Sequence, residues 1–250
     1  MKIVLSLKHS IFVILFLIPF VALKAQSGNI EFVENKGQWD QRVKFQGKVQ
    51  SGAFFVRGTG GFTVLQQNQE DLSAIQDYFH YSHNSGGSSA KTITNKDLVL
   101  RSHSYNVDFV GASPSMEIVP DKAAEGYNNY FIGNDPSKWA ANCRIFQGVT
   151  VKNIYPNVDV RYYTQSGTMK YDIIVRPGAD ISKIALKYEG VKKLGLQKKE
   201  LLVETSLGRV KELAPYTYQV SSKERKDLEC KYVVKDNIVK FQLKNYDPAA

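Results

Sequence analysis

The chain has 250 residues, of which 43% are hydrophobic, and it carries 33 Lys and Arg against 24 Asp and Glu. This length and apolar content can bury a substantial core, as one large β domain or two small ones. Much of the formal charge of +9 lies in short basic clusters, 192–193, 198–199 and 223–226, between apolar alternations that are typical of solvated strand ends. Nucleic acid is therefore not an expected partner.

Residues 1–25 have the pattern of a secretory signal peptide. Lys2 and Lys8 precede an apolar run at 11–23, and Ala25-Gln26 offers a small residue at the cleavage point. The run is shorter than the about 20 residues that span a bilayer. We expect a soluble mature chain, residues 26–250, exported to the cell surface or beyond, or to the periplasm if no sorting domain follows.

The first half of the mature chain predicts short strands joined by turns. Apolar segments at 53–57 and 62–65 flank glycine-rich residues 58–61, which predicts a hairpin. The segment 71–83 is ambiguous, because its apolar spacing fits a helix while its aromatic run at 78–81 fits a strand. A flexible polar loop is expected at 84–89.

The second half alternates more regularly between polar and apolar residues. The segments 158–163 and 169–175, joined by a Gly-containing turn, are the strongest hairpin prediction. Turn signals recur about every 8–12 residues, which favours an all-β, antiparallel β-sandwich with at most one or two short helical turns and no sustained helix. A subdivision into two domains would fall near 140–150.

The most aromatic stretch of the chain is 126–139, which reads Gly-Tyr-Asn-Asn-Tyr-Phe-Ile-Gly-Asn-Asp-Pro-Ser-Lys-Trp. Asp135-Pro136-Ser137 is typical of a capped helical turn, which would press Trp139 onto a sheet. An aromatic corner of the core is the favoured interpretation, and a platform for stacking a ligand is the alternative. The candidate stacking residues are Tyr127, Tyr130, Trp139, Tyr162 and Tyr163.

Two cysteines, Cys143 and Cys230, remain in the mature chain. In an oxidising compartment a disulfide between them would close a loop of about 88 residues and contribute roughly 4–5 kcal/mol. Two separately buried thiols are equally compatible with the sequence. No histidine stands near either cysteine in sequence, so a catalytic thiol is not expected.

Metal and catalytic sites are weakly indicated. His80 and His83 would share one face only on a helix, and no third zinc ligand is apparent nearby. Asn128, Asn129, Asn134 and Asp135 could supply oxygens to calcium, but turn chemistry explains them better. A carboxylate pair for glycoside hydrolysis could come from six aspartates: Asp71, Asp77, Asp108, Asp135, Asp159 and Asp172. The chain has no G-x-S-x-G, H-E-x-x-H or P-loop motif, so we expect neither an enzyme nor a cofactor.

Several long motifs resemble one known family. They occur at 32–39, 126–139, 155–163, 170–180, 205–208 and 215–219, the first reading Phe-Val-Glu-Asn-Lys-Gly-Gln-Trp. Together they resemble the N-terminal domain of unknown function of large secreted Bacteroidota surface proteins, over nearly all of residues 29–247. In that family the domain commonly precedes β-propeller-type repeats, immunoglobulin-like modules and a sorting domain for type IX secretion, and is often labelled gliding-motility-associated.

The resemblance carries no established catalytic residues. Members usually continue past position 248 with another apolar strand, so we expect this chain to be a fragment or the product of a truncated gene. The family resemblance also implies contact with the secretion machinery.

These observations leave three functions open. We favour a non-catalytic module of an exported surface protein, acting in surface display or adhesion through polysaccharide or other surface protein domains. A carbohydrate-binding module would show coplanar exposed aromatic rings in a groove. A glycoside hydrolase would show a cleft holding two acids at the separation that this chemistry needs.

Overall fold

The computed structural model describes residues 31–49, 51–84, 98–165, 168–221 and 224–248. The predicted signal peptide at 1–25 and the segment 85–89 of the predicted polar loop lie outside the described residues. Strands dominate the rest. In order they are β1 (Phe32–Glu34), β2 (Val43–Val49), β3 (Gly52–Arg57), β4 (Phe62–Gln67), β5 (Ser102–Phe109), β6 (Glu117–Tyr130), β7 (Ala140–Tyr155), β8 (Val158–Gln165), β9 (Thr168–Val175), β10 (Ala185–Glu189), β11 (Lys193–Gln197), β12 (Glu200–Thr205), β13 (Gly208–Glu212), β14 (Thr217–Val220), β15 (Arg225–Leu228), β16 (Cys230–Lys235) and β17 (Ile238–Leu243).

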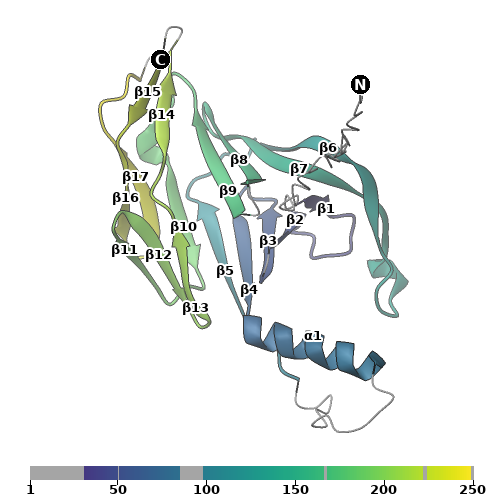
Figure 1. Cartoon of the computed structure of the whole chain (residues 1–250). Coiled ribbons are helices and arrows are strands. Elements are labelled where there is room, and N and C mark those ends of the chain that lie inside the picture. Colours follow the sequence, from purple (N-terminus) through teal and green to yellow (C-terminus); the bar gives the residue numbers. More distant parts are fainter. Residues whose placement is uncertain (1–30, 50, 85–97, 166–167, 222–223, 249–250) are drawn as a thin grey trace, which may run out of the picture.

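The strands form three sheets (Figure 1). The largest has 12 strands in the order β16-β17-β10-β5-β4-β3-β2-β1-β7-β8-β9, with β6 also paired to β7. A three-stranded sheet, β11-β12-β13, and a two-stranded sheet, β14-β15, complete the fold. Every pairing among the described strands is antiparallel. The all-β, antiparallel prediction is therefore confirmed.

Both hairpins predicted from the sequence are present. β3 pairs with β4, and β8 pairs with β9 in a continuous register from Val158↔Val175 to Gln165↔Thr168. The interval 140–150, where a subdivision was considered, lies inside β7, which pairs with β1, β6 and β8. A continuous strand, not a linker, occupies that interval.

One helix is much longer than the sequence analysis expected. α1 runs from Gln69 to Asn84, 16 residues, so the expectation of no sustained helix is wrong. Asn68 caps it, since its side-chain oxygen accepts from the Asp71 backbone N–H at 3.0 Å, and the first turn is acidic. The helical spacing of Leu72 and Ile75 therefore prevails over the strand propensity of the aromatic run at 78–81.

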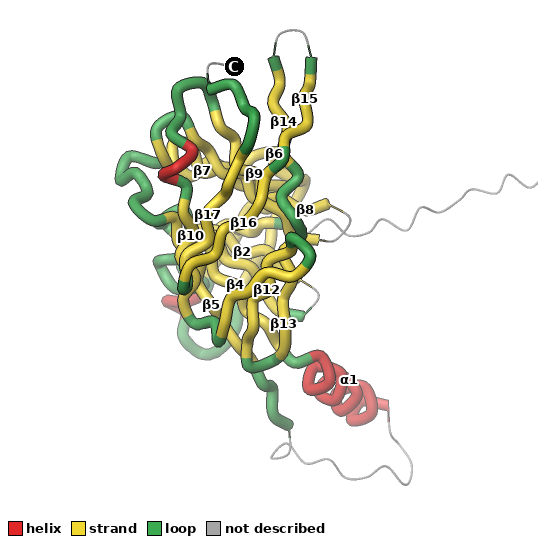
Figure 2. Tube along the Cα trace, turned by 90° about the vertical axis from the view of Figure 1, so that its left-hand side faces the viewer, coloured by secondary structure: helices red, strands yellow, loops and turns green. Residues whose placement is uncertain are grey.

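α1 extends away from the sheets (Figure 2). None of the helices in the described residues combines the length and the hydropathy that crossing a bilayer requires. Two short 3-10 helices, η2 (Pro136–Lys138) and η3 (Ile181–Lys183), each begin after an aspartate, Asp135 or Asp180, whose side chain caps the turn.

The main core forms where the large sheet curves back on itself. Tyr162 of β8 is fully buried and packs against two rings of the β3–β4 hairpin. The distances between ring centroids are 5.5 Å to Phe54 of β3 and 5.8 Å to Phe62 of β4. The Tyr162 hydroxyl donates to the Gly60 carbonyl at 2.7 Å. This hydrogen bond ties β8 to the β3–β4 turn.

Gly60 has no room for a side chain. Its φ is +78°, and an added Cβ would lie 2.5 Å from Ile154 Cδ1. Gly60→Ala should therefore lower the free energy of unfolding by about 2–3 kcal/mol, from the left-handed backbone and the forced repacking together. Gly111→Ala is the matched control, because its φ is +70° but no atom lies within 4 Å, so only the backbone cost of about 1 kcal/mol is expected. Equal losses in urea unfolding would contradict the packing argument.

Glu212 joins the three-stranded sheet to the large one. Its carboxylate accepts hydrogen bonds from the hydroxyls of Tyr188 on β10, at 2.8 Å, and Tyr171 on β9, at 3.1 Å. Nearby, the Tyr232 hydroxyl of β16 donates to the Leu213 carbonyl at 3.0 Å. Burial raises the pKa of the Glu212 carboxyl above its usual value, although the two tyrosine hydrogen bonds oppose the shift.

The raised pKa predicts a pH-dependent stability. The folded protein binds the Glu212 proton more tightly than the unfolded chain, so this group favours folding most below about pH 4.5, the unfolded pKa. That contribution is lost as the pH rises from there through the folded pKa. Relative to the parent, Glu212→Gln should gain stability with rising pH over this range, measured by urea unfolding at a series of pH values. A constant difference between the two proteins would contradict the assignment.

Candidate functional site

Two of the sequence motifs that carry the family resemblance, 32–39 and 126–139, meet at one place in the structure. Motif 32–39 forms β1 and the loop after it, and motif 126–139 forms the far part of a long hairpin. We call residues 123–144 the arm, because there β6 and β7 continue beyond the β1–β7 pairing at Phe32↔Phe146 and Val33↔Ile145. Figure 1 shows the arm projecting past β1 and ending in a short helical turn.

The arm packs on the protein body through a small apolar cluster that is separate from the main core. Val33 of β1 and Cys143 of β7 are buried in it, and Ala140 and Ile145 complete its buried part. The ring of Tyr130 meets Trp39 edge to face at 5.2 Å between centroids. Tyr130, predicted as a stacking residue, therefore packs against the body of the protein.

Polar contacts fix the loop that carries Trp39. The Asn35 side-chain N–H donates to the carbonyls of Val43 at 2.8 Å and Asp40 at 2.9 Å, and its oxygen accepts from the Gly37 backbone N–H at 3.0 Å. The Asn35 side chain thus joins the beginning and the end of this loop by hydrogen bonds to its backbone, as asparagine commonly does in turns. Lys36 Nζ also donates to the Asn142 carbonyl of the arm at 2.9 Å.

An ion pair adds a second tie between β1 and the arm. Glu34 accepts from the Arg144 backbone N–H at 2.9 Å and pairs with its guanidinium at 3.3 Å. Partial burial raises the pKa of Glu34, but the hydrogen bonds and charge of Arg144 outweigh it and hold the pKa below its usual value. Glu34 therefore stays ionised at neutral pH.

Two of the four candidate calcium ligands, Asn129 and Asp135, bind the backbone of the arm. Asn142 has a φ of +55° at a bulge in β7, and its N–H donates to the Asn129 side-chain oxygen at 2.9 Å. Asp135 accepts from the backbone N–H and hydroxyl of Ser137, which lowers the pKa of its carboxyl and caps η2. These contacts agree with the turn chemistry that the sequence favoured.

The tip of the arm exposes apolar side chains. We define the apolar tip as Phe131, Ile132 and Trp139, which are 59%, 76% and 43% exposed. Tyr127 is also exposed, but it pairs with Arg144 nearer the base of the arm. Tyr130 and Ala140 pair across the ends of β6 and β7 and face the small apolar cluster, whereas Phe131 and Trp139, directly beyond these strand ends, are exposed. Those two rings meet edge to face at 5.8 Å, and the Trp139 indole N–H donates to the Gly133 carbonyl at 3.2 Å.

The five predicted stacking residues do not form one surface. Trp139 belongs to the apolar tip and Tyr127 is exposed nearer the base of the arm, so the interpretation of the motif as a core corner is wrong for these two side chains. Tyr162 is a core residue because its ring packs between β8 and the β3–β4 hairpin of the large sheet. Tyr163, on the opposite side of β8, donates to Asp172 at 3.0 Å and lies beneath the Arg161 guanidinium.

The sequence analysis did not assign a role to Phe131 and Ile132. Both stand in a turn between a strand and Gly133, where polar residues are the norm. An apolar pair in such a turn was the available signal. This signal was overlooked because the whole aromatic motif was expected to pack inward.

The two cysteines are free in the structure. Cys143 lies in the small apolar cluster between the arm and the protein body, and Cys230 begins β16 at the far end of the large sheet. Of the two arrangements that the sequence left open, a disulfide and two separate thiols, the structure shows the separate thiols. Burial raises the pKa of each thiol, so both are protonated at neutral pH and poorly nucleophilic.

The candidate carboxylates are dispersed, and most have structural partners. Asp71 binds Arg101, whose hydrogen bonds lower its pKa to about 2. Asp108 pairs with Arg57 at 2.6 Å, and Asp159 pairs with Arg176, which lowers the pKa of Asp159. A general acid for glycoside hydrolysis needs a raised pKa. Asp71 and Asp159 are held ionised instead.

Positions 80 and 83 lie on α1, so the helical condition for a shared histidine face is met. In the part of the chain that the structure describes, no three His, Cys, Asp or Glu side chains gather as a metal site would require. The His80 side chain is exposed.

Comparison with known families places the chain in one of them. Residues 32–250 match the family described as a domain of unknown function, DUF7948. Since the match spans most of the chain, the protein belongs to this family. Neither the curated proteins nor the solved structures gave a significant match.

Proposed function

We propose that this protein is a non-catalytic module of an exported bacterial surface protein, and that it binds another folded surface protein through the apolar tip. The observation that carries the proposal is the exposure of Phe131, Ile132 and Trp139 at the end of a braced arm. Exposed apolar side chains grouped together mark interaction sites on soluble proteins. Tryptophan and other aromatic residues also contribute most to binding energy at protein interfaces.

A braced arm suits this role. Trp39, Asn35 and the Glu34–Arg144 ion pair hold its base, so little conformational entropy is lost when the tip docks. Polar groups surround the apolar side chains, among them Asn129 and Asp135, both exposed. An apolar centre with a polar rim is the usual anatomy of a protein interface.

Polysaccharide is the less favoured partner for the tip. The rings of Phe131 and Trp139 lie at 67° to each other, so they do not present one flat platform to a sugar. Ile132, the most exposed apolar residue of the tip, has no ring face at all. These side chains fit an apolar pocket on a protein better.

The cellular setting is part of the proposal. The basic and apolar pattern of residues 1–25 supports export by a signal peptide. The motifs at 32–39 and 126–139 support an origin in Bacteroidota surface proteins, with type IX secretion as the route and display or adhesion as the role. In this setting the partner would be another exported domain on the same cell surface.

The proposal is tested with labelled mature chain, residues 26–250, added to cells of the source bacterium that lack the gene. We expect saturable binding that protease treatment of the cells abolishes and periodate oxidation of their glycans leaves intact. Binding lost after periodate and kept after protease would replace the protein partner with polysaccharide. No saturable binding would overturn the proposal.

A further inference from the structure

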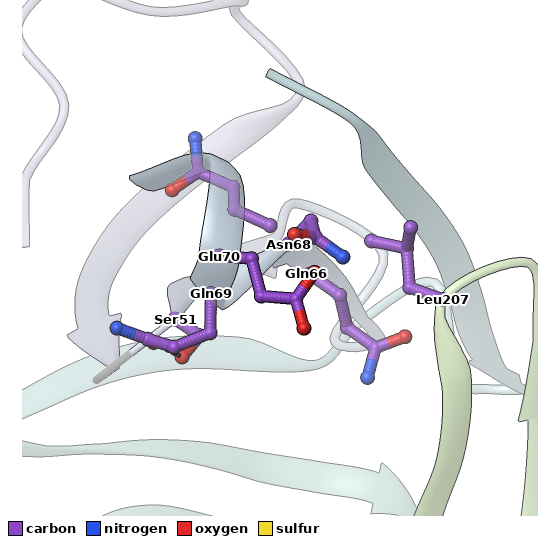
Figure 3. A pocket seen from close by; sticks show the side chains of 7 residues that line it. Ser51, Gln66, Asn68, Gln69, Glu70 and Leu207 are labelled. Atoms are coloured by element: carbon purple, nitrogen blue, oxygen red, sulfur yellow. Dashed lines mark hydrogen bonds between the residues drawn. The ribbon is translucent and has the colours of Figure 1, made fainter. Parts of the chain in front are cut away.

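A second candidate site lies outside the arm. A polar hollow of about 320 Å³ opens where the β2–β3 turn, the junction of β4 with α1, and the β12–β13 turn meet (Figure 3). Four consecutive amide residues, 66–69, line it together with the Ser51 hydroxyl, the Glu70 carboxylate and the Leu207 methyl groups. Segments distant in the sequence therefore build one polar concavity.

Two buried polar atoms beside this hollow have no partner. Gln66 lines the hollow, and His103 stands directly opposite it on the neighbouring strand β5. Among the described residues, no hydrogen bond reaches Gln66 Oε1 or His103 Nε2, although both atoms are buried. An unsatisfied buried polar atom costs about 1–3 kcal/mol and calls for an explanation, and a bound molecule with matching polar groups provides one.

The hydrogen bonds of the His103 ring identify which nitrogen carries the proton. The Ser206 backbone N–H donates to Nδ1 at 3.4 Å, and Ser206 Oγ lies 2.9 Å from the same nitrogen. A backbone N–H can only donate, so Nδ1 accepts and the neutral ring carries its proton on Nε2. A free donor on His103 thus stands across from a free acceptor on Gln66.

A hydroxyl group matches this pair, because it accepts one hydrogen bond and donates another. The Asn68 side-chain oxygen caps α1 and the Ser51 hydroxyl donates to the Gln69 side-chain oxygen, so the amide N–H groups of Asn68 and Gln69 remain as donors to ligand hydroxyls. Leu207 offers an apolar edge for ring C–H groups. Anions fit poorly, even though α1 begins here, since Glu70 and Asp71 already place two carboxylates in its first turn.

We propose that this hollow binds a neutral polyhydroxylated ligand, a sugar ring or similar polyol, with one hydroxyl between Gln66 Oε1 and His103 Nε2. The site is independent of the apolar tip, because none of its lining residues belongs to the arm. It would give the module a small-ligand site in addition to its protein contact.

The test is saturation-transfer NMR on the mature chain with a panel of neutral monosaccharides and inositol, with glucuronate as an anionic comparison. We expect at least one neutral sugar to bind saturably and glucuronate to bind more weakly. Gln66→Met should weaken that binding at least tenfold without lowering the melting temperature, because the amide oxygen it removes makes no hydrogen bond. Gln219→Met is the matched control, since its amide bonds Asp247 away from the hollow.

If Gln66→Met does not fold, Leu207→Trp in the β12–β13 turn fills the hollow and should block the same ligand. Serine variants of the apolar tip should bind the sugar like the parent, which separates this proposal from the protein contact. The proposal is overturned if no panel member binds saturably, or if the folded Gln66 or Leu207 variant binds as tightly as the parent.

Discussion

Tyr162→Ala is expected to lower the free energy of unfolding by about 3–5 kcal/mol, enough to unfold much of the protein at ambient temperature. The ring is fully buried and packs against Phe54 and Phe62, so its removal leaves a cavity between β8 and the β3–β4 hairpin. The lost hydroxyl also leaves the Gly60 carbonyl without this partner. Urea denaturation followed by circular dichroism measures the loss.

Tyr162→Phe separates the two contributions. It keeps the ring and removes only the hydrogen bond to Gly60, so a loss of about 1–2 kcal/mol is expected. If Tyr162→Ala instead folded with the stability of the parent, Tyr162 would not be a core residue. Its sequence-based assignment as a stacking residue would then be open again.

The second large effect concerns binding. Replacing Phe131, Ile132 and Trp139 with serine should weaken attachment to the partner by about 100-fold or more, because central apolar side chains dominate interface energies. The same variant should lose no more than about 2 kcal/mol of stability, since Phe131 and Ile132 are more than half exposed. Titration of labelled chain onto cells gives the first quantity, and urea unfolding gives the second.

Exposed apolar residues elsewhere provide the matched control. Leu196, Leu213 and Val220 are 49%, 71% and 60% exposed and lie outside the arm. Their triple serine variant removes similar exposed apolar surface but should bind like the parent. Equal loss of binding in both variants would show that general surface hydrophobicity, not the apolar tip, causes attachment.

The strand pattern was predictable because alternation reports directly on which side chains are buried. The β8–β9 hairpin follows from the alternation on both sides of its turn, and the structure pairs these two segments. α1 was missed because helical spacing and an aromatic run overlap at 78–81. In the structure the Asn68 side chain caps α1, and this capping residue lies before the segment 71–83 on which the prediction was based.

The candidate site was predictable only in part. The motif 126–139 was correctly singled out, but local pattern does not say which face of a hairpin meets the protein body. Tyr130 packs inward because Trp39, about 90 residues earlier in the chain, lies against it. Tyr162 and Tyr163 lie on opposite faces of β8, and alternation with the buried Val158 and Val160 places Tyr162 on the core side. The sequence carried this signal, but the two tyrosines were grouped together as stacking candidates.

The measurement that tests the protein contact most directly is photo-crosslinking from the apolar tip. A benzophenone amino acid replaces Ile132, which is 76% exposed, and in a parallel protein it replaces Leu196, which is 49% exposed on β11. On irradiated source cells we expect one discrete protein adduct from position 132 that Trp139→Ser reduces, and none of that size from position 196. No adduct from position 132, or the same adducts from both positions, would contradict a partner-binding role for the tip.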